Sequence, residues 1–106
     1  MSTDIGITLY AFKDAHDFAC YYDIIGKRKD GTFVKYIDTE KIAAEYYGKD
    51  TKWSPNFENL VVLGDTICID LYAHRDFTEK LPGEKLCTFR FTWDDKKQWF
   101  GVQKTP

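Results

Sequence analysis

The stretch from Asn59 to His74, NLVVLGDTICIDLYAH, is the most apolar run in the chain and constrains the fold more than any other segment. After Gly64-Asp65, its apolar side chains occur at every second position, at Ile67, Ile69, Leu71 and Ala73. Side chains on a strand alternate between its two faces, so this spacing predicts a half-buried β-strand over 66–74. The preceding residues 60–63 are predicted either as its partner across a Gly64-Asp65 turn or as the start of one long strand with a bulge at Gly64.

Further strands are predicted on both sides of this segment. A first strand is expected over 4–12, and 85–93 is expected to form a hairpin with 98–104. Asp30-Gly31 separates two runs rich in aromatic and β-branched residues, which is a strong hairpin signal for about 19–26 with 32–38. Residues 14–25 also carry apolar side chains at helical spacing, and we therefore expect a short helical turn near Asp14 before that hairpin.

The segment DTEKIAAEYYG, residues 38–48, has the clearest helical pattern. Asp38 or Thr39 can cap its start, Gly48 can end it, and its apolar side chains form one stripe. A helix of about three turns is marginal alone, so this stripe is expected to pack on the sheet. Polar loops are predicted over 49–59 and 75–84, the second ending in a type II turn at Leu81-Pro82-Gly83.

These segments predict a single globular domain over 1–106 with an α+β fold. It consists mainly of an antiparallel β-sheet of six to seven strands, with one main helix at about 39–48. A curved sheet wrapped on the helix and a partly open barrel both fit this pattern.

Charge and cysteine content limit the partners and the compartment. The 15 basic and 17 acidic side chains are mixed along the chain and give a net charge of −2. A nucleic-acid-binding protein usually carries a basic patch or a basic net charge, so we do not expect a nucleic-acid partner. No apolar run approaches the ~20 residues of a membrane span, and the first residues lack a signal-peptide pattern, so we expect a cytoplasmic protein with no membrane partner. No CxxC or HxxxH spacing indicates a metal or cofactor, and reduced core thiols are expected at Cys20, Cys68 and Cys87.

Two clusters of polar residues are candidate sites. Asp70, Tyr72 and His74 share one face of the strand 66–74, yet no catalytic motif accompanies them, and we expect a solvent-facing polar strand rather than an enzyme. The one local basic cluster, flanked by tyrosines, offers an alternative function in single-strand nucleic-acid binding, although lysines at a hairpin tip are also a common way to keep strands soluble. This cluster consists of Lys27, Arg28, Lys29 and Lys35.

The aromatic content points to a binding surface. Eight Phe, seven Tyr and three Trp are more rings than a core of this size can enclose. Because one helix cannot cover the whole sheet, we expect an exposed aromatic patch framed by charges on the sheet face and the region 46–57. The predicted protein-binding residues are Tyr46, Tyr47, Trp53, Phe57, Tyr72 and Arg90.

The leading hypothesis is a non-enzymatic protein that occupies a partner protein's surface, as immunity proteins and phage-encoded or bacterial inhibitors do. The alternative is a small-ligand-binding domain whose pocket is lined by Tyr22, Phe89, Phe91 and Trp93, with Arg90 or His74 as a polar contact. A homodimer is expected if the outer face of the last strand, near Trp99, is apolar and unpaired.

Overall fold

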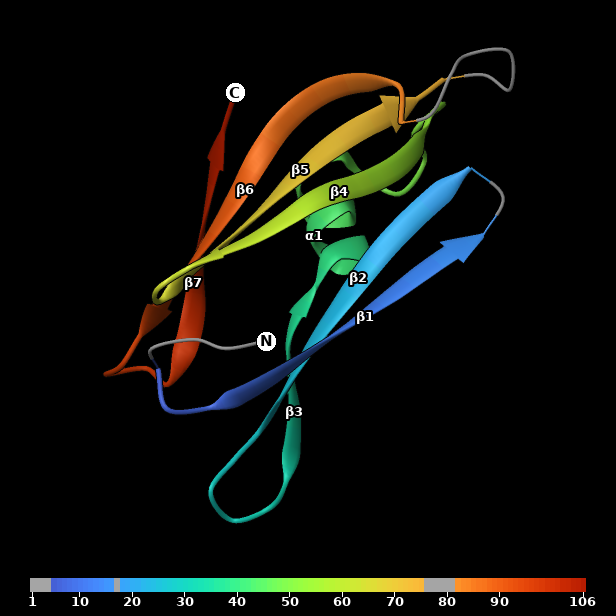
Figure 1. Ribbon diagram of the computed structural model, residues 1–106. Coiled ribbons are helices and arrows are strands. Elements are labelled where there is room, and N and C mark those ends of the chain that lie inside the picture. The colour runs from blue at the N-terminus through green and yellow to red at the C-terminus, as the bar shows by residue number, and fades with distance from the viewer. Residues whose placement is uncertain (1–4, 17, 76–81) are drawn as a thin grey trace.

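The computed structural model describes residues 5–16, 18–75 and 82–106. The described residues form one sheet of seven strands and one helix, which confirms the predicted α+β class (Figure 1). The elements in chain order are β1 (Thr8–His16), β2 (Ala19–Lys27), β3 (Phe33–Asp38), α1 (Thr39–Tyr47), β4 (Ser54–Leu63), β5 (Thr66–His74), β6 (Glu84–Asp94) and β7 (Trp99–Thr105). No helix in this part of the chain is long and apolar enough to cross a membrane.

The strands follow the order β1-β2-β4-β5-β6-β7, and β3 pairs with β2 beside this path. All pairs are antiparallel except β2 with β4, which meet in parallel at Cys20 and Asn56. The Asn56 side-chain amide donates to the carbonyl of Phe18 and fixes this junction. Beyond it β2 and β4 diverge, and α1 contacts both strands where they separate (Figure 1).

Thr39, the first residue of α1, joins the helix to β2. Its hydroxyl accepts a hydrogen bond from the Tyr22 amide at 2.7 Å and donates one to the Tyr22 carbonyl at 3.0 Å. Thr39 is fully buried, so these two bonds satisfy backbone groups that β3 leaves unpaired where it ends. The helix then follows the predicted pattern: Asp38 accepts from the Lys41 amide at its start, and Gly48 ends it at a φ of 85°.

The core lies between the sheet and α1. The predicted inner strand β5 has Ile67, Ile69, Leu71 and Ala73 fully buried, which confirms the alternation read from the sequence. The rings of Tyr46 and Phe89 pack edge to face with centroids 5.1 Å apart, and the Tyr47 hydroxyl donates to the Cys87 sulfur at 3.4 Å. The stripe of α1 therefore packs on β6, as its marginal length requires.

The sheet curves strongly but does not close. Tyr36 of β3 packs its ring on Trp93, Trp99 and Phe100 of β6 and β7, with centroids 5.0–5.9 Å apart. These contacts bring β3 next to β7 although the two strands are not paired. A Cβ on Gly26 would meet the Tyr36 ring, so only glycine allows this approach. The expected curved sheet is therefore observed.

Two sequence predictions are wrong. Asp14 is not in a helical turn, because β1 continues to His16 and pairs with β2 along its whole length. Pairing between neighbouring strands outweighs helical spacing here, and the first strand is shifted from the expected 4–12 to 8–16. Residues 49–59 are not all loop, since β4 begins at Ser54 and pairs with β5.

Other predictions are confirmed or settled. The hairpin of β2 and β3 is observed, as is the β6–β7 hairpin. The alternatives at Gly64 resolve into two strands and a tight turn, with Gly64 at a φ of 64°. The bulge lies instead at Asn59, whose φ is 59° and where the β4–β5 register shifts. The predicted turn at 81–83 lies partly outside the described residues.

Candidate functional site

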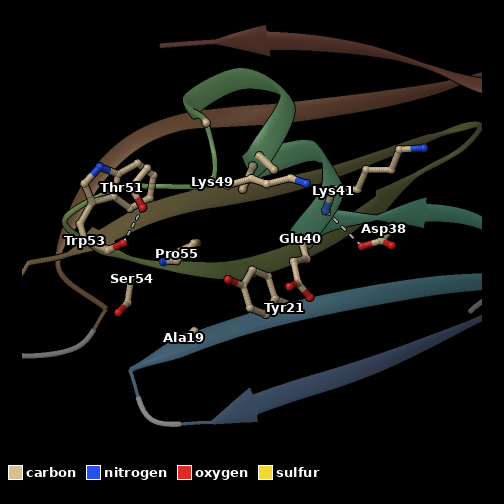
Figure 2. Close-up of a pocket in the computed structure, with 13 residues that line it drawn as sticks. Ala19, Tyr21, Asp38, Glu40, Lys41, Lys49, Thr51, Trp53, Ser54 and Pro55 are labelled. Atoms are coloured by element: carbon tan, nitrogen blue, oxygen red, sulfur yellow. Dashed lines mark hydrogen bonds between the residues drawn. The ribbon is translucent and has the colours of Figure 1, made fainter.

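The predicted helix–loop region borders a surface hollow of about 730 Å³ between α1 and the starts of β2 and β4 (Figure 2). Trp53 lies at one end of this hollow, edge to face with the Tyr47 ring at 5.4 Å. Figure 2 shows the Tyr21 ring beside Glu40 at its lower side. Burial raises the pKa of the Tyr21 hydroxyl, and the Glu40 carboxylate raises it further. The lining mixes charged and polar groups with the rings of Tyr21 and Trp53.

The structure does not bring the six predicted contact residues together. Tyr46 is 40% exposed, whereas Phe57 is fully buried and belongs to the core. Tyr46 and Tyr47 pack against the face of β6 that carries Cys87 and Phe89. Tyr72 and Arg90 alternate onto the opposite face of β5 and β6. The predicted set is thus divided between two sides of the sheet.

An exposed apolar cluster that the sequence analysis missed lies on the outer face of β1, β2 and β3. The rings of Phe33, Phe12 and Tyr10 are 61%, 55% and 43% exposed, and Ile25 is half-buried beside them. Tyr10 lies directly opposite Ile25 in the β1–β2 register, and its ring centroid is 6.3 Å from that of Phe33. We call these four residues the outer patch; they line a shallow hollow of about 500 Å³.

Charged side chains frame the outer patch. The Lys27 ammonium lies 5.9 Å from the centre of the Phe33 ring. Next to it, the Lys35 ammonium lies 3.5 Å from the Asp23 carboxylate and 3.9 Å from the Asp38 carboxylate. An apolar centre with a mixed-charge rim is the arrangement found in protein–protein interfaces.

The basic cluster considered for nucleic-acid binding is partly neutralised. Lys35 pairs with Asp23 and Asp38, and Lys27 lies over Phe33. Arg28 and Lys29 lie in the turn between β2 and β3, where the Asp30 carboxylate accepts two hydrogen bonds from Thr32. The carboxylates of Asp23 and Asp38 therefore offset the charge of Lys35 in this cluster.

The predicted polar face of β5 is a hydrogen-bonded network. The Asp70 carboxylate accepts from Thr88 at 2.6 Å and Asn59 at 3.0 Å, and the Lys85 ammonium lies 3.6 Å away. Burial raises the pKa of Asp70, but these hydrogen bonds and the lysine together outweigh it, and the net shift is downward. His74 is buried and stacks on Phe18 at 4.8 Å. Both oxygens of the Asp70 carboxylate are therefore engaged, one by Thr88 and Lys85 and the other by Asn59.

Acid stability gives a test of this network. A carboxyl whose folded pKa lies below its unfolded value stabilises the fold above the unfolded pKa and loses that contribution as pH falls through the folded pKa. We therefore expect Asp70→Asn to flatten the loss of stability below about pH 4. Urea denaturation between pH 2 and 6, with exposed Asp95→Asn as the control, measures this slope. If the unfolding free energy changes equally with pH in both variants and in the unmodified protein, the Asp70 network does not contribute to acid stability.

The described residues contain no group of three His, Cys, Asp or Glu side chains that could hold a metal. Cys20, Cys68 and Cys87 are free thiols, and burial raises the pKa of Cys20. A raised pKa keeps a thiol protonated and unreactive near neutral pH. Cys20 and Cys87 are buried and act as small packing residues, whereas Cys68 is half-buried.

The ligand-pocket alternative placed aromatic side chains around a cavity. Phe89 and Phe91 are instead at most 1% exposed, and Trp93 is 8% exposed, because all three pack in the core. The hollows described above are lined by other residues. No family model, curated protein or solved structure matches the chain.

Proposed function

We propose that this protein binds another protein through the outer patch and acts by occupying that partner's surface, as an inhibitor or immunity-type protein does. The exposure of the outer patch carries this proposal. The Phe33 ring lies on the surface, 61% exposed, and its centroid is 6.3 Å from that of Tyr10. Apolar side chains clustered on a surface and rimmed by charge are a mark of protein contact sites.

The outer patch supplies what a tight contact needs. Tyr and other rings dominate binding hot spots because each buries a large area with few rotatable bonds. The strands beneath the patch are hydrogen-bonded to one another, β1 to β2 and β2 to β3, so its rings are held in place before the partner arrives. The paired charges of Lys35 with Asp23 and Asp38 lie at the edge, where they can orient the partner.

A capture experiment tests this proposal. We expect the tagged protein to retain a specific partner from a lysate of its source cells, and Phe33→Asp to reduce the retained amount at least tenfold, because it buries a charge in the contact. Leu63→Asp is the matched control, since Leu63 is 56% exposed but lies at the β4–β5 turn. Circular dichroism should show both variants folded. Equal retention by all three proteins would contradict the proposed surface.

A further inference from the structure

One face of β2 connects the outer patch to the hollow beside α1. Side chains on a strand alternate between its two faces, so every second residue of β2 lies on the same side. These residues are Tyr21, Asp23, Ile25 and Lys27. Ile25 belongs to the outer patch, and Tyr21 lines the hollow of about 730 Å³ between α1 and the starts of β2 and β4. A strand rises about 3.3 Å per residue, so the two sites lie about 13 Å apart along β2.

Carboxylates occupy the surface between the two sites. Asp23 lies opposite Asp38 in the β2–β3 register. The Lys35 ammonium lies 3.5 Å from the Asp23 carboxylate and 3.9 Å from the Asp38 carboxylate. Glu40 follows in the first turn of α1 and lines the hollow. One ammonium thus faces two carboxylates, and Glu40 adds a third acidic group, so this strip of the surface is negatively charged.

The Glu40 carboxylate is the acidic group of this strip that a cation from outside can reach. Its side chain is exposed, and it forms no ion pair with a described residue. Lys41 and Lys49 also line the hollow, but Figure 2 shows the Lys41 side chain extending away from Tyr21 and Glu40. The Glu40 charge acts inside the hollow, because it adds to the burial that raises the pKa of the Tyr21 hydroxyl.

We propose that the hollow beside α1 receives an arginine side chain of the protein that binds the outer patch, with its guanidinium group on the Glu40 carboxylate. This inference rests on the proposed function and adds the chemistry of the partner. Arginine fits better than lysine, because its planar guanidinium group bonds a carboxylate through two hydrogen bonds and packs well beside aromatic rings. The rings of Tyr21 and Trp53 line the same hollow.

The distance between the two sites limits the partner segment. In an extended segment, side chains four positions apart point to the same side and lie about 13 Å apart. A partner segment lying along β2 therefore carries an apolar side chain for the outer patch and an arginine four residues away. The acidic strip between the two sites favours neutral or basic side chains between them, since like charges would repel.

Titration with N-acetyl-arginine methylamide, followed by heteronuclear NMR spectra, tests the hollow on its own. We expect the amide signals of Tyr21 and Glu40 to shift. The citrulline analogue, which has the same shape without the charge, should bind at least about fivefold more weakly, and Glu40→Gln should weaken the arginine probe equally. Glu45→Gln is the matched control, since Glu45 is exposed on α1 but does not line the hollow. Equal affinity for both probes, or no shift at Glu40, would overturn the proposal.

Partner capture separates the arginine site from the outer patch. We expect Glu40→Gln to lower the retained amount about threefold to tenfold and Glu45→Gln to leave it unchanged. Circular dichroism should show both variants folded, because both side chains are exposed. Retention that falls with Phe33→Asp but not with Glu40→Gln would reject the arginine site and leave the proposed function standing. Retention that falls with Glu40→Gln but not with Phe33→Asp would reject the outer patch and keep the hollow as the contact.

Discussion

Replacing Phe89 by Ala is expected to lower the free energy of unfolding by about 3–5 kcal/mol. Phe89 is fully buried, and its ring centroid lies 5.1 Å from that of Tyr46 and 6.1 Å from that of Phe57. It therefore joins α1, β4 and β6, and its loss would open a cavity where α1 packs on β6. Chemical denaturation followed by tryptophan fluorescence measures the change.

The matched control for this change is Phe33→Ala, which removes the same atoms from a side chain that is 61% exposed. Its expected effect on stability is within about 0.5 kcal/mol. A loss of similar size at both positions would show that the assignment of core and surface is incorrect. A small effect at Phe33 together with reduced partner capture would separate stability from binding.

Replacing Thr39 by Val is expected to cost about 2–5 kcal/mol, although the two side chains have nearly the same shape. The hydroxyl bonds both the amide and the carbonyl of Tyr22, and valine can do neither. Each buried backbone group left without a partner costs about 1–3 kcal/mol. Thermal unfolding should therefore shift to clearly lower temperature.

The hydroxyl itself is tested by Thr39→Ser, which keeps both hydrogen bonds and loses one methyl group. We expect it to retain most of the stability, with a loss of about 1 kcal/mol. Equal destabilisation by Val and Ser would instead assign the role of Thr39 to packing.

The sequence predicted the parts of the fold that depend on local patterns. The alternation in β5 predicts only a strand, and the residues that begin and end α1 predict only a helix; the structure confirms both. The segment around Asp14 is compatible with either a helix or a strand. Its side chains have helical spacing, but nine residues of pairing with β2 satisfy the backbone groups of both strands, and this non-local term decides the conformation.

The outer patch is only partly encoded in the local sequence. Tyr10 and Phe12 share a face in the expected strand over 4–12 just as they do in β1. Ile25 joins them only through the β1–β2 register, which places it opposite Tyr10. The observation that could have found it is the i, i+2 spacing of these two rings. The remaining member, Phe33, joins only through the β2–β3 hairpin.

Tyr46, Tyr47 and Trp53 are not part of the outer patch because they pack on another part of the fold. The Tyr46 ring, although 40% exposed, contacts Phe89, and the Trp53 ring packs on Tyr47. Burial raises the pKa of Tyr47 to about 12, and its hydrogen bond to Cys87 contributes. A count of aromatic residues predicts that some rings lie outside the core, but the chain topology decides which rings are exposed on the surface.

Site-specific photo-cross-linking tests the central claim most directly. A photoreactive phenylalanine analogue is placed at position 33, or at position 63 as the control, and the source cells are irradiated. Binding through the outer patch predicts a single covalent adduct with another protein from position 33 and none from position 63. An adduct from position 63 or position 46, with none from position 33, would contradict it.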